Sequence, residues 1–128
     1  MSCVFAKIFD NTPVSFVFAD MELWVGAEET LKILRLPSQA LNYIPISEKT
    51  SLKQLEQCGE NNKLFITTLG VGYLVNLFEQ VPERVLTFAN LFLTDVVMEI
   101  KTDRLLCNII QTENNVLNLL NTNTIEVV

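Results

Sequence analysis

The stretch that most constrains the fold lies at residues 22–36, where a short aromatic strand leads directly into an amphipathic helix. It reads Glu22-Leu-Trp-Val-Gly-Ala-Glu-Glu-Thr-Leu-Lys-Ile-Leu-Arg-Leu36. Aromatic and β-branched side chains favour a strand at its start. Two adjacent glutamates then suit a helix N-terminus, and an apolar stripe follows until Pro37 ends the helix. A chain with this transition needs both a sheet and a helical layer.

Other strand-forming segments lie on both sides of this transition. Residues 4–9 and 14–18 are rich in Val, Ile and Phe and are separated by turn-forming residues, and Ala19 to Glu22 suit a hairpin connection to the next strand. Residues 64–67 form a later strand-like run. The expected fold class is therefore α+β, with a small antiparallel sheet built from the N-terminal hairpin and the 64–67 strand.

Helices are expected to pack with this sheet at residues 27–36, 38–44, 70–80, 83–100 and 104–120. The polar residues 47–57 fit an exposed helical turn or loop. The helix at 83–100 is apolar on two faces, so it either runs through the core or presents its second face to another chain. The segment 104–120 fits one helix with a weak middle or two short helices, and the last eight residues fit a strand or an extended tail.

Length and composition indicate a packed globule. The chain has 128 residues, of which 49% are apolar, and it contains only four Gly and four Pro. We divide it into a domain at 1–101 and a C-terminal helical extension at 102–128 that packs on the same domain or on a partner. Neither a signal peptide nor a membrane-spanning run of apolar residues is visible, so the sequence predicts an intracellular, soluble protein without a membrane partner.

Little in the chain points to catalysis. Histidine, the commonest general base and metal ligand, is missing, and three scattered cysteines favour free thiols. The acidic pairs Glu28–Glu29 and Glu79–Glu83 have no partner base or nucleophile at a diagnostic spacing. Gly70-Val-Gly72 is only a fragment of a phosphate-binding motif, which we interpret as a close-packed turn. We therefore expect no enzyme activity, no cofactor and no metal.

The order of these pieces resembles a known viral domain. The residues that carry the resemblance are Leu23-Trp-Val-Gly-Ala27, Leu34-Arg-Leu36, Leu64-Phe-Ile-Thr67 with Gly70 and Leu74, and Pro82-Glu83 with Phe88, Phe92 and Asp95-Val-Val97. Together they look like the Bro-N domain, the N-terminal half of baculovirus repeated-reading-frame proteins and of many phage antirepressors. The resemblance implies a large DNA virus as the source, nucleic-acid binding, and a location in the host nucleus or in the virion.

The charge of the chain argues against a duplex-binding surface. Nine Lys and Arg stand against fifteen Asp and Glu, for a net charge of −6, whereas phosphate binding needs several cations. The one basic stretch, residues 30–55, carries the candidate phosphate contacts of a small DNA-binding regulator of viral or host transcription, namely Lys32, Arg35, Lys49 and Lys53.

We favour a non-enzymatic protein of viral assembly, associated with the nucleocapsid or another viral complex, over the DNA-binding regulator. Such a protein binds other viral proteins or itself through apolar surface. Its candidate interface lies on the second face of the 83–100 helix and on the C-terminal extension, and comprises Leu86, Leu93, Val97, Leu105, Ile109, Val116, Leu117 and Leu120.

Overall fold

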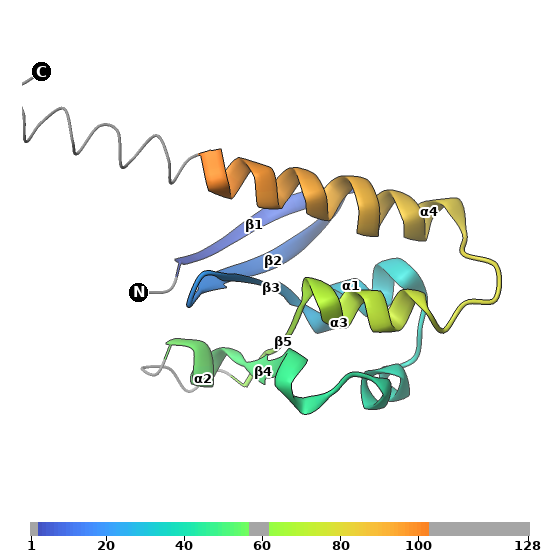
Figure 1. The fold of residues 1–128 in the computed structure, drawn as a ribbon, viewed down its shortest axis with the longest axis horizontal. Helices are drawn as coiled ribbons and strands as arrows, with labels where there is room; N and C mark the ends of the chain where they lie inside the picture. Colours follow the sequence, from blue (N-terminus) through green and yellow to red (C-terminus); the bar gives the residue numbers. More distant parts are fainter. Residues whose placement is uncertain (1–2, 57–61, 103–128) are drawn as a thin grey trace, which may run out of the picture. The chain divides into compact units, whose positions relative to one another are not determined.

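The computed structural model describes residues 3–56 and 62–102, and it confirms the α+β class (Figure 1). The chain divides into two units, Met1–Thr94 and Asp95–Val128. The first holds every strand of the described part and the helices that pack on them. In the second, residues 95–102 are helical.

Five antiparallel strands form the sheet. In chain order they are β1 (Cys3–Phe9), β2 (Thr12–Ala19), β3 (Glu22–Gly26), β4 (Lys49–Ser51) and β5 (Leu64–Thr67). Their order in the sheet is β1-β2-β3-β5-β4, so the later strands are added beyond β3 and leave β1 at one edge (Figure 1).

Two tight hairpins connect the first three strands. Asp10 and Asn11 join β1 to β2, and Asp20 and Met21 join β2 to β3, all four with positive φ. Two successive residues with positive φ make type I′ turns, whose twist matches that of the strands. Aspartate and asparagine tolerate this backbone better than most residues do, which explains why the chain turns at these points.

The helices are shorter than the sequence predicts. Helix α1 (Ala27–Leu34) stops at Arg35, which adopts a left-handed conformation, and residues 38–43 form a 3₁₀ helix, η1 (Ser38–Tyr43), rather than an α-helix. Helix α3 (Thr68–Val75) ends five residues before the expected limit of 80. The expected helix at 104–120 lies outside the described residues.

Two further regions differ from the expectation. The stretch expected as an exposed helical turn or loop at 47–57 contains two short helices, η2 (Ile46–Glu48) and α2 (Leu52–Glu56), and between them the strand β4, which was not expected. The helix expected at 83–100 is not uniform, because α4 (Glu83–Leu86) passes into a π-helical segment, η3 (Thr87–Phe92), and residues 93–102 are again helical. Figure 1 draws the whole stretch as one ribbon helix.

The main core lies between the sheet and helices α1, α3 and α4–η3. Residues paired across antiparallel strands point to the same face, so Phe9, Phe16 and Val25 share one side of the sheet. On that side, the rings of Phe88 and Phe92 meet Phe9 at centroid distances of 5.2 and 5.1 Å. Contacts of α1 and α3 with the strands and with α4–η3 close the layer.

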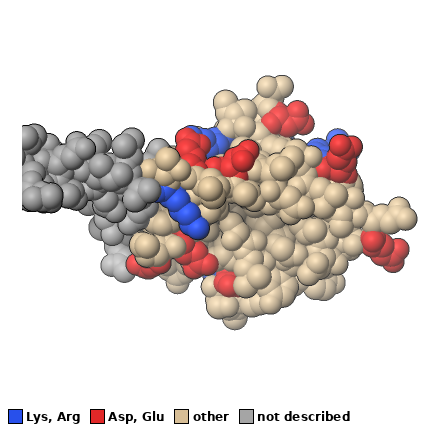
Figure 2. Space-filling model, turned by 45° about the horizontal axis from the view of Figure 1, so that its top comes forward, with Lys and Arg blue, Asp and Glu red and all other residues tan. Residues whose placement is uncertain are grey.

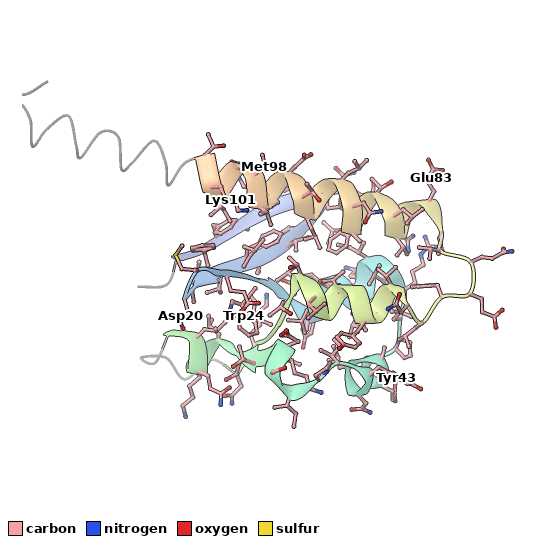
Figure 3. The ribbon with its side chains drawn as sticks, viewed as in Figure 1. Asp20, Trp24, Tyr43, Glu83, Met98 and Lys101 are labelled. Carbon is pink, nitrogen blue, oxygen red and sulfur yellow. The ribbon has the colours of Figure 1, made fainter. Side chains whose placement is uncertain are left out.

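A smaller apolar cluster occupies the other face. Val17, Ala19 and Phe65 are buried there, and Trp24 packs against them together with Leu52 and Leu55 of α2 (Figure 3). Trp24 is thus a sheet-face residue, in keeping with a packing role. Its Nε1 is buried and has no hydrogen-bond acceptor among the described residues.

Candidate functional site

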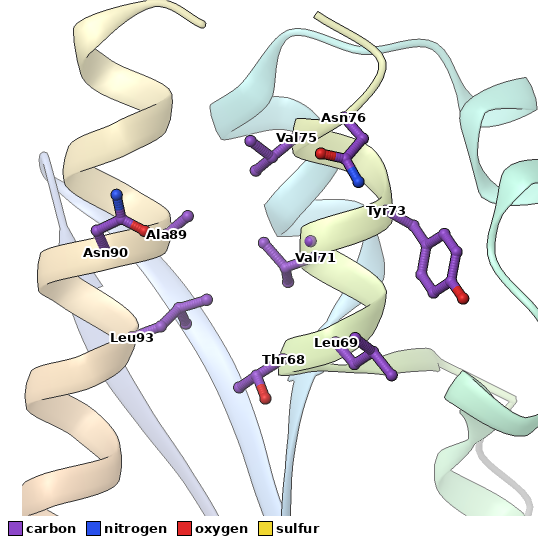
Figure 4. A pocket seen from close by; sticks show the side chains of 10 residues that line it. Thr68, Leu69, Val71, Tyr73, Val75, Asn76, Ala89, Asn90 and Leu93 are labelled. Carbon is purple, nitrogen blue, oxygen red and sulfur yellow. The ribbon is translucent and has the colours of Figure 1, made fainter.

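An open groove with a volume of about 510 Å³ lies between α3 and the segment 89–93 (Figure 4). Apolar and uncharged polar side chains share its wall. The lining residues are Thr68, Leu69, Val71, Gly72, Tyr73, Val75, Asn76, Ala89, Asn90 and Leu93.

One wall of the groove depends on how α3 is seated. The side chain of Thr67 caps α3 by accepting a hydrogen bond of 3.0 Å from the backbone N–H of Gly70. A Cβ at Gly70 would lie 3.2 Å from the Glu48 carbonyl oxygen and 3.2 Å from Ile66 Cβ, so only glycine fits without displacement. The close-packing interpretation of this motif therefore holds for Gly70. It fails for Gly72, where an added Cβ meets nothing within 4 Å.

The opposite wall depends on the π-helical turn. A π-helix holds more residues per turn than an α-helix, so it changes which side chains share a face. Leu93 comes directly after the π-helical segment and is buried in the groove wall, whereas Leu86, directly before that segment, is exposed. In a regular α-helix, Leu86 and Leu93 would lie on the same face. Here Leu86 is exposed and Leu93 is buried.

The groove offers binding rather than catalysis. None of its lining residues carries a charge, and its polar groups are hydroxyls and amides, which orient a partner by hydrogen bonds. Leu69 and Tyr73 of α3 are exposed at its rim, and Figure 4 shows both on the outer side of the helix. Contact with an uncharged protein surface suits this composition.

The four cations of the DNA-binding alternative lie in three different local environments. Lys32 and Arg35 line a small cavity of about 160 Å³ that also contains Arg84 and the acidic Asp10. Lys49 instead donates a hydrogen bond of 3.0 Å to the Leu41 carbonyl oxygen, and Lys53 is exposed on α2. On the face in Figure 2, basic side chains lie near acidic ones beside a broad uncharged area.

Sequence reasoning missed one ion pair. Glu29, interpreted as a helix-start residue, accepts hydrogen bonds of 2.8 Å from Lys63 Nζ and 3.2 Å from the backbone N–H of Ser15. Burial of this carboxylate acts to raise its pKa, but these hydrogen bonds outweigh burial, and the pKa lies below its ordinary value. The pair ties α1 to the start of β5. Because Lys63 is 34 residues away in the chain, no local spacing indicates it.

The remaining candidate interface residues are only partly visible. Val97 is half-buried in the helical residues 95–102. The other five, Leu105, Ile109, Val116, Leu117 and Leu120, lie outside the described residues. Within 3–56 and 62–102, no three His, Cys, Asp or Glu side chains gather in a way that would hold a metal ion. No helix in these ranges is long and apolar enough to cross a bilayer.

Comparison with known proteins identifies a viral family. Residues 10–125 match the family described as the baculovirus polyhedron envelope protein, PEP, N terminus. Among solved structures, the N-terminal domain of Orf22, a Cydia pomonella granulovirus envelope protein, superimposes with a TM-score of 0.59. The match covers 76% of this chain and 99% of that one at 20% sequence identity, which shows a shared fold. No curated protein matches the chain significantly.

The resemblance to the Bro-N domain is therefore wrong. It rested on the order of strands and helices and on apolar spacing, which unrelated α+β domains share. The matching family spans 116 of the 128 residues, from 10 to 125, and is a different one. The expectation of nucleic-acid binding, which the resemblance alone implied, loses its basis.

Proposed function

The chain belongs to the family of the baculovirus polyhedron envelope protein N terminus, and from this premise we propose that it is a non-enzymatic structural constituent of the polyhedron envelope. The family match over residues 10–125 carries this proposal. The fold shared with a granulovirus envelope protein domain supports it. Of the two expected associations, with the nucleocapsid or with another viral complex, the family match gives no support to the nucleocapsid, and we propose the envelope as the complex.

The described surface suits a structural role. The groove beside α3 has no charged group beside its Thr68 and Tyr73 hydroxyls that could act as a general base, so it favours contact with protein rather than turnover of a substrate. The acidic balance, with a net charge of −6, disfavours contacts that rely on nucleic acid. Association with other envelope components, or with further copies of this chain, is the interaction that remains.

Immunogold labelling of sectioned infected cells tests the proposal. An antibody against this chain should label the periphery of polyhedra, and purified polyhedra should retain the chain after washing in high salt. Labelling confined to nucleocapsids, or loss of the chain from washed polyhedra, would contradict an envelope role.

We propose that Leu86, the exposed member of the candidate interface in the first unit, contributes to this association. Leu86→Asp places a charge at a site that a partner would desolvate, so it should lower the amount of chain in purified polyhedra. Leu91→Asp is the matched control, because Leu91 is also exposed but was not on the predicted interface face. Equal effects of both variants would remove Leu86 from the interface.

A further inference from the structure

The two edges of the sheet are built differently. The edge strand β4 has three residues, all polar, Lys49, Thr50 and Ser51. Short length and a lysine are common means by which proteins prevent edge-to-edge pairing. The other edge strand, β1, has seven residues, Cys3 to Phe9, and contains no proline. Each edge strand carries one lysine, Lys49 in β4 and Lys7 in β1, so the difference between the edges lies in length: β4 is short and polar, whereas β1 is long and mostly apolar.

The hairpin geometry shows which backbone groups of β1 point outward. A type I′ turn at Asp10 and Asn11 closes on a hydrogen-bonded pair, Phe9 and Thr12. Hydrogen-bonded and non-bonded pairs alternate along an antiparallel ladder. The N–H and C=O groups of Val4, Ala6 and Ile8 therefore point away from β2, and no other strand in residues 3–56 and 62–102 pairs with them.

The side chains of the same three residues are also exposed. Val4 has 48% and Ile8 71% of its surface accessible, and Ala6 between them is exposed as well. Phe5 and Phe9, on the opposite face, pack against Phe16 and Phe88. An edge strand therefore presents unpaired backbone groups together with an uncharged apolar row, a combination that favours pairing with another strand.

We propose that β1 pairs antiparallel with β1 of a second copy, about a two-fold axis at Ala6, so that the two sheets become continuous. In this register Ala6 faces its own counterpart and Val4 faces Ile8 of the other copy. All three outward-pointing residues then form hydrogen-bonded pairs, with about six backbone hydrogen bonds in total. The exposed row becomes a set of apolar cross-strand pairs.

Neighbouring registers are less favourable. A shift that centres the axis on Lys7 would place two lysines directly opposite each other, which is destabilising. A shift that centres it on Phe5 leaves Ile8 unpaired and uses only Val4 and Ala6. The register centred on Ala6 instead places Lys7 opposite Phe5 of the other copy. The sequence of β1 thus selects one alignment of the two strands.

Charge permits a second copy as the occupant, and the self-matching sequence of β1 favours it. The chain carries a net charge of −6, so two copies repel at long range, and the contact costs least at a strand that adds no acidic groups of its own. Between residues 3 and 9 there is one lysine and no acid. A seven-residue strand pair is smaller than a standard interface, so we expect weak association in solution that many copies in an envelope would reinforce. The proposed contact would serve the structural role in the envelope, but the evidence for it is the exposed edge of β1 and not the family match.

Amide hydrogen exchange of the native full-length chain tests the contact without any substitution. At low concentration, the amides of Val4, Ala6 and Ile8 should exchange rapidly, while those of Phe5 and Lys7 are protected by β2. At millimolar concentration, the first three should become at least tenfold slower. Protection at every dilution would mean that another part of the chain covers β1, and rapid exchange at every concentration would mean that nothing does. Either result overturns the proposal.

Cysteine cross-linking tests the register. In a background with Cys3, Cys58 and Cys107 replaced by serine, Val4→Cys and Ile8→Cys are made separately and mixed under mild oxidation. Paired residues have Cα atoms about 5.5 Å apart, within disulfide range, whereas Val4 and its own counterpart are roughly 14 Å apart. The mixture should give a disulfide heterodimer and each variant alone should not. Homodimers of either variant, or no heterodimer at a concentration where exchange slows, would refute the register.

Two substitutions of Ala6, Ala6→Pro and Ala6→Lys, should prevent the pairing of β1 with β1 of a second copy. Proline removes an N–H that β2 does not use, and lysine places like charges opposite each other across the axis. Both should abolish the concentration-dependent protection, whereas Ile46→Lys, at another exposed apolar site, should leave it unchanged. Persistence of the protection in Ala6→Lys would overturn the proposal even if Ala6→Pro failed to fold. The immunogold experiment is independent, so failure of the envelope role and failure of this contact are distinguishable.

Discussion

Removal of the ring of Phe88 is expected to destabilise the domain more than any change on the same helix surface. Phe88 has no exposed surface. Its ring centroid lies 5.2 Å from that of Phe9 on β1 and 5.5 Å from that of Phe92 on the next helical turn. The side chain therefore joins the π-helical segment to the edge strand of the sheet, and Phe88→Ala leaves a cavity at that junction.

The expected cost follows from these contacts. Burial of a large apolar side chain contributes about 1.5–3 kcal/mol, and each aromatic pair adds roughly 0.5–1.5 kcal/mol beyond the buried area. Burial and two ring contacts together give about 2.5–6 kcal/mol, a range that includes the costs of about 3–5 kcal/mol measured for Phe→Ala in protein cores. Total stabilities are about 5–15 kcal/mol, so the variant should lose a large share of its stability.

Urea unfolding followed by far-UV circular dichroism measures this loss. Phe88→Ala should lower the midpoint concentration at nearly constant slope, because the surface exposed on unfolding changes little. Leu91→Ala is the control, since Leu91 lies in the same π-helical segment with 62% of its surface exposed, and it should cost less than about 1 kcal/mol. A cost below roughly 2 kcal/mol for Phe88→Ala, or equal costs for both, would refute the assignment of this ring to the core.

Two further predictions concern single contacts. Because the pKa of Glu29 is lowered in the folded chain, its stabilising contribution is complete above the ordinary glutamate pKa and is lost as pH falls through the lowered value. Glu29→Gln should therefore destabilise the chain less at pH 3 than at pH 7, as urea unfolding at both values can measure; a constant difference would contradict the ion pair. Gly70→Ala should cost about 1–3 kcal/mol through its contacts at 3.2 Å, whereas Gly72→Ala, with open space, should stabilise α3 by about 0.5–1 kcal/mol. Thermal melts that move in the same direction for both would show that the two glycines are not distinguished by packing.

Elements that depend on local sequence were predicted well. The first three strands are rich in β-branched and aromatic side chains, and each connection contains an Asp or Asn that tolerates positive φ, so both hairpins could be recognised from a few neighbouring residues. The acidic start and the apolar stripe of α1 are equally local, and Pro37 limits its end. Strand β5 was placed within one residue.

Elements that depend on distant residues were missed. Strand β4 consists of three polar residues with no strand signal of their own. It forms a strand because it pairs with residues 64–66 of β5. The π-helical turn has no sequence signal in a stretch that suits an α-helix, yet it decides that Leu93 is buried and Leu86 exposed. One wall of the groove contains α3, whose Gly70 lies close to the Glu48 carbonyl just before β4, and the other wall follows the π-helical segment.

The exposed row on β1 shows how long-range pairing decides the surface. Residues in β1 and β2 have the same β-branched and aromatic character, so sequence alone does not tell which of them is an edge strand. The edge is decided by β5, which pairs with β3 about 40 residues later and so extends the sheet away from β1. Had β5 paired with β1 instead, Val4, Ala6 and Ile8 would have their backbone groups satisfied within one chain. The pairing of Val25 with Ile66 therefore makes β1 the edge strand and leaves its outward backbone N–H and C=O groups without a partner strand among the described residues. The sequence of β1 is compatible with antiparallel pairing to a second β1, because Val4 then lies opposite Ile8 and Ala6 opposite Ala6.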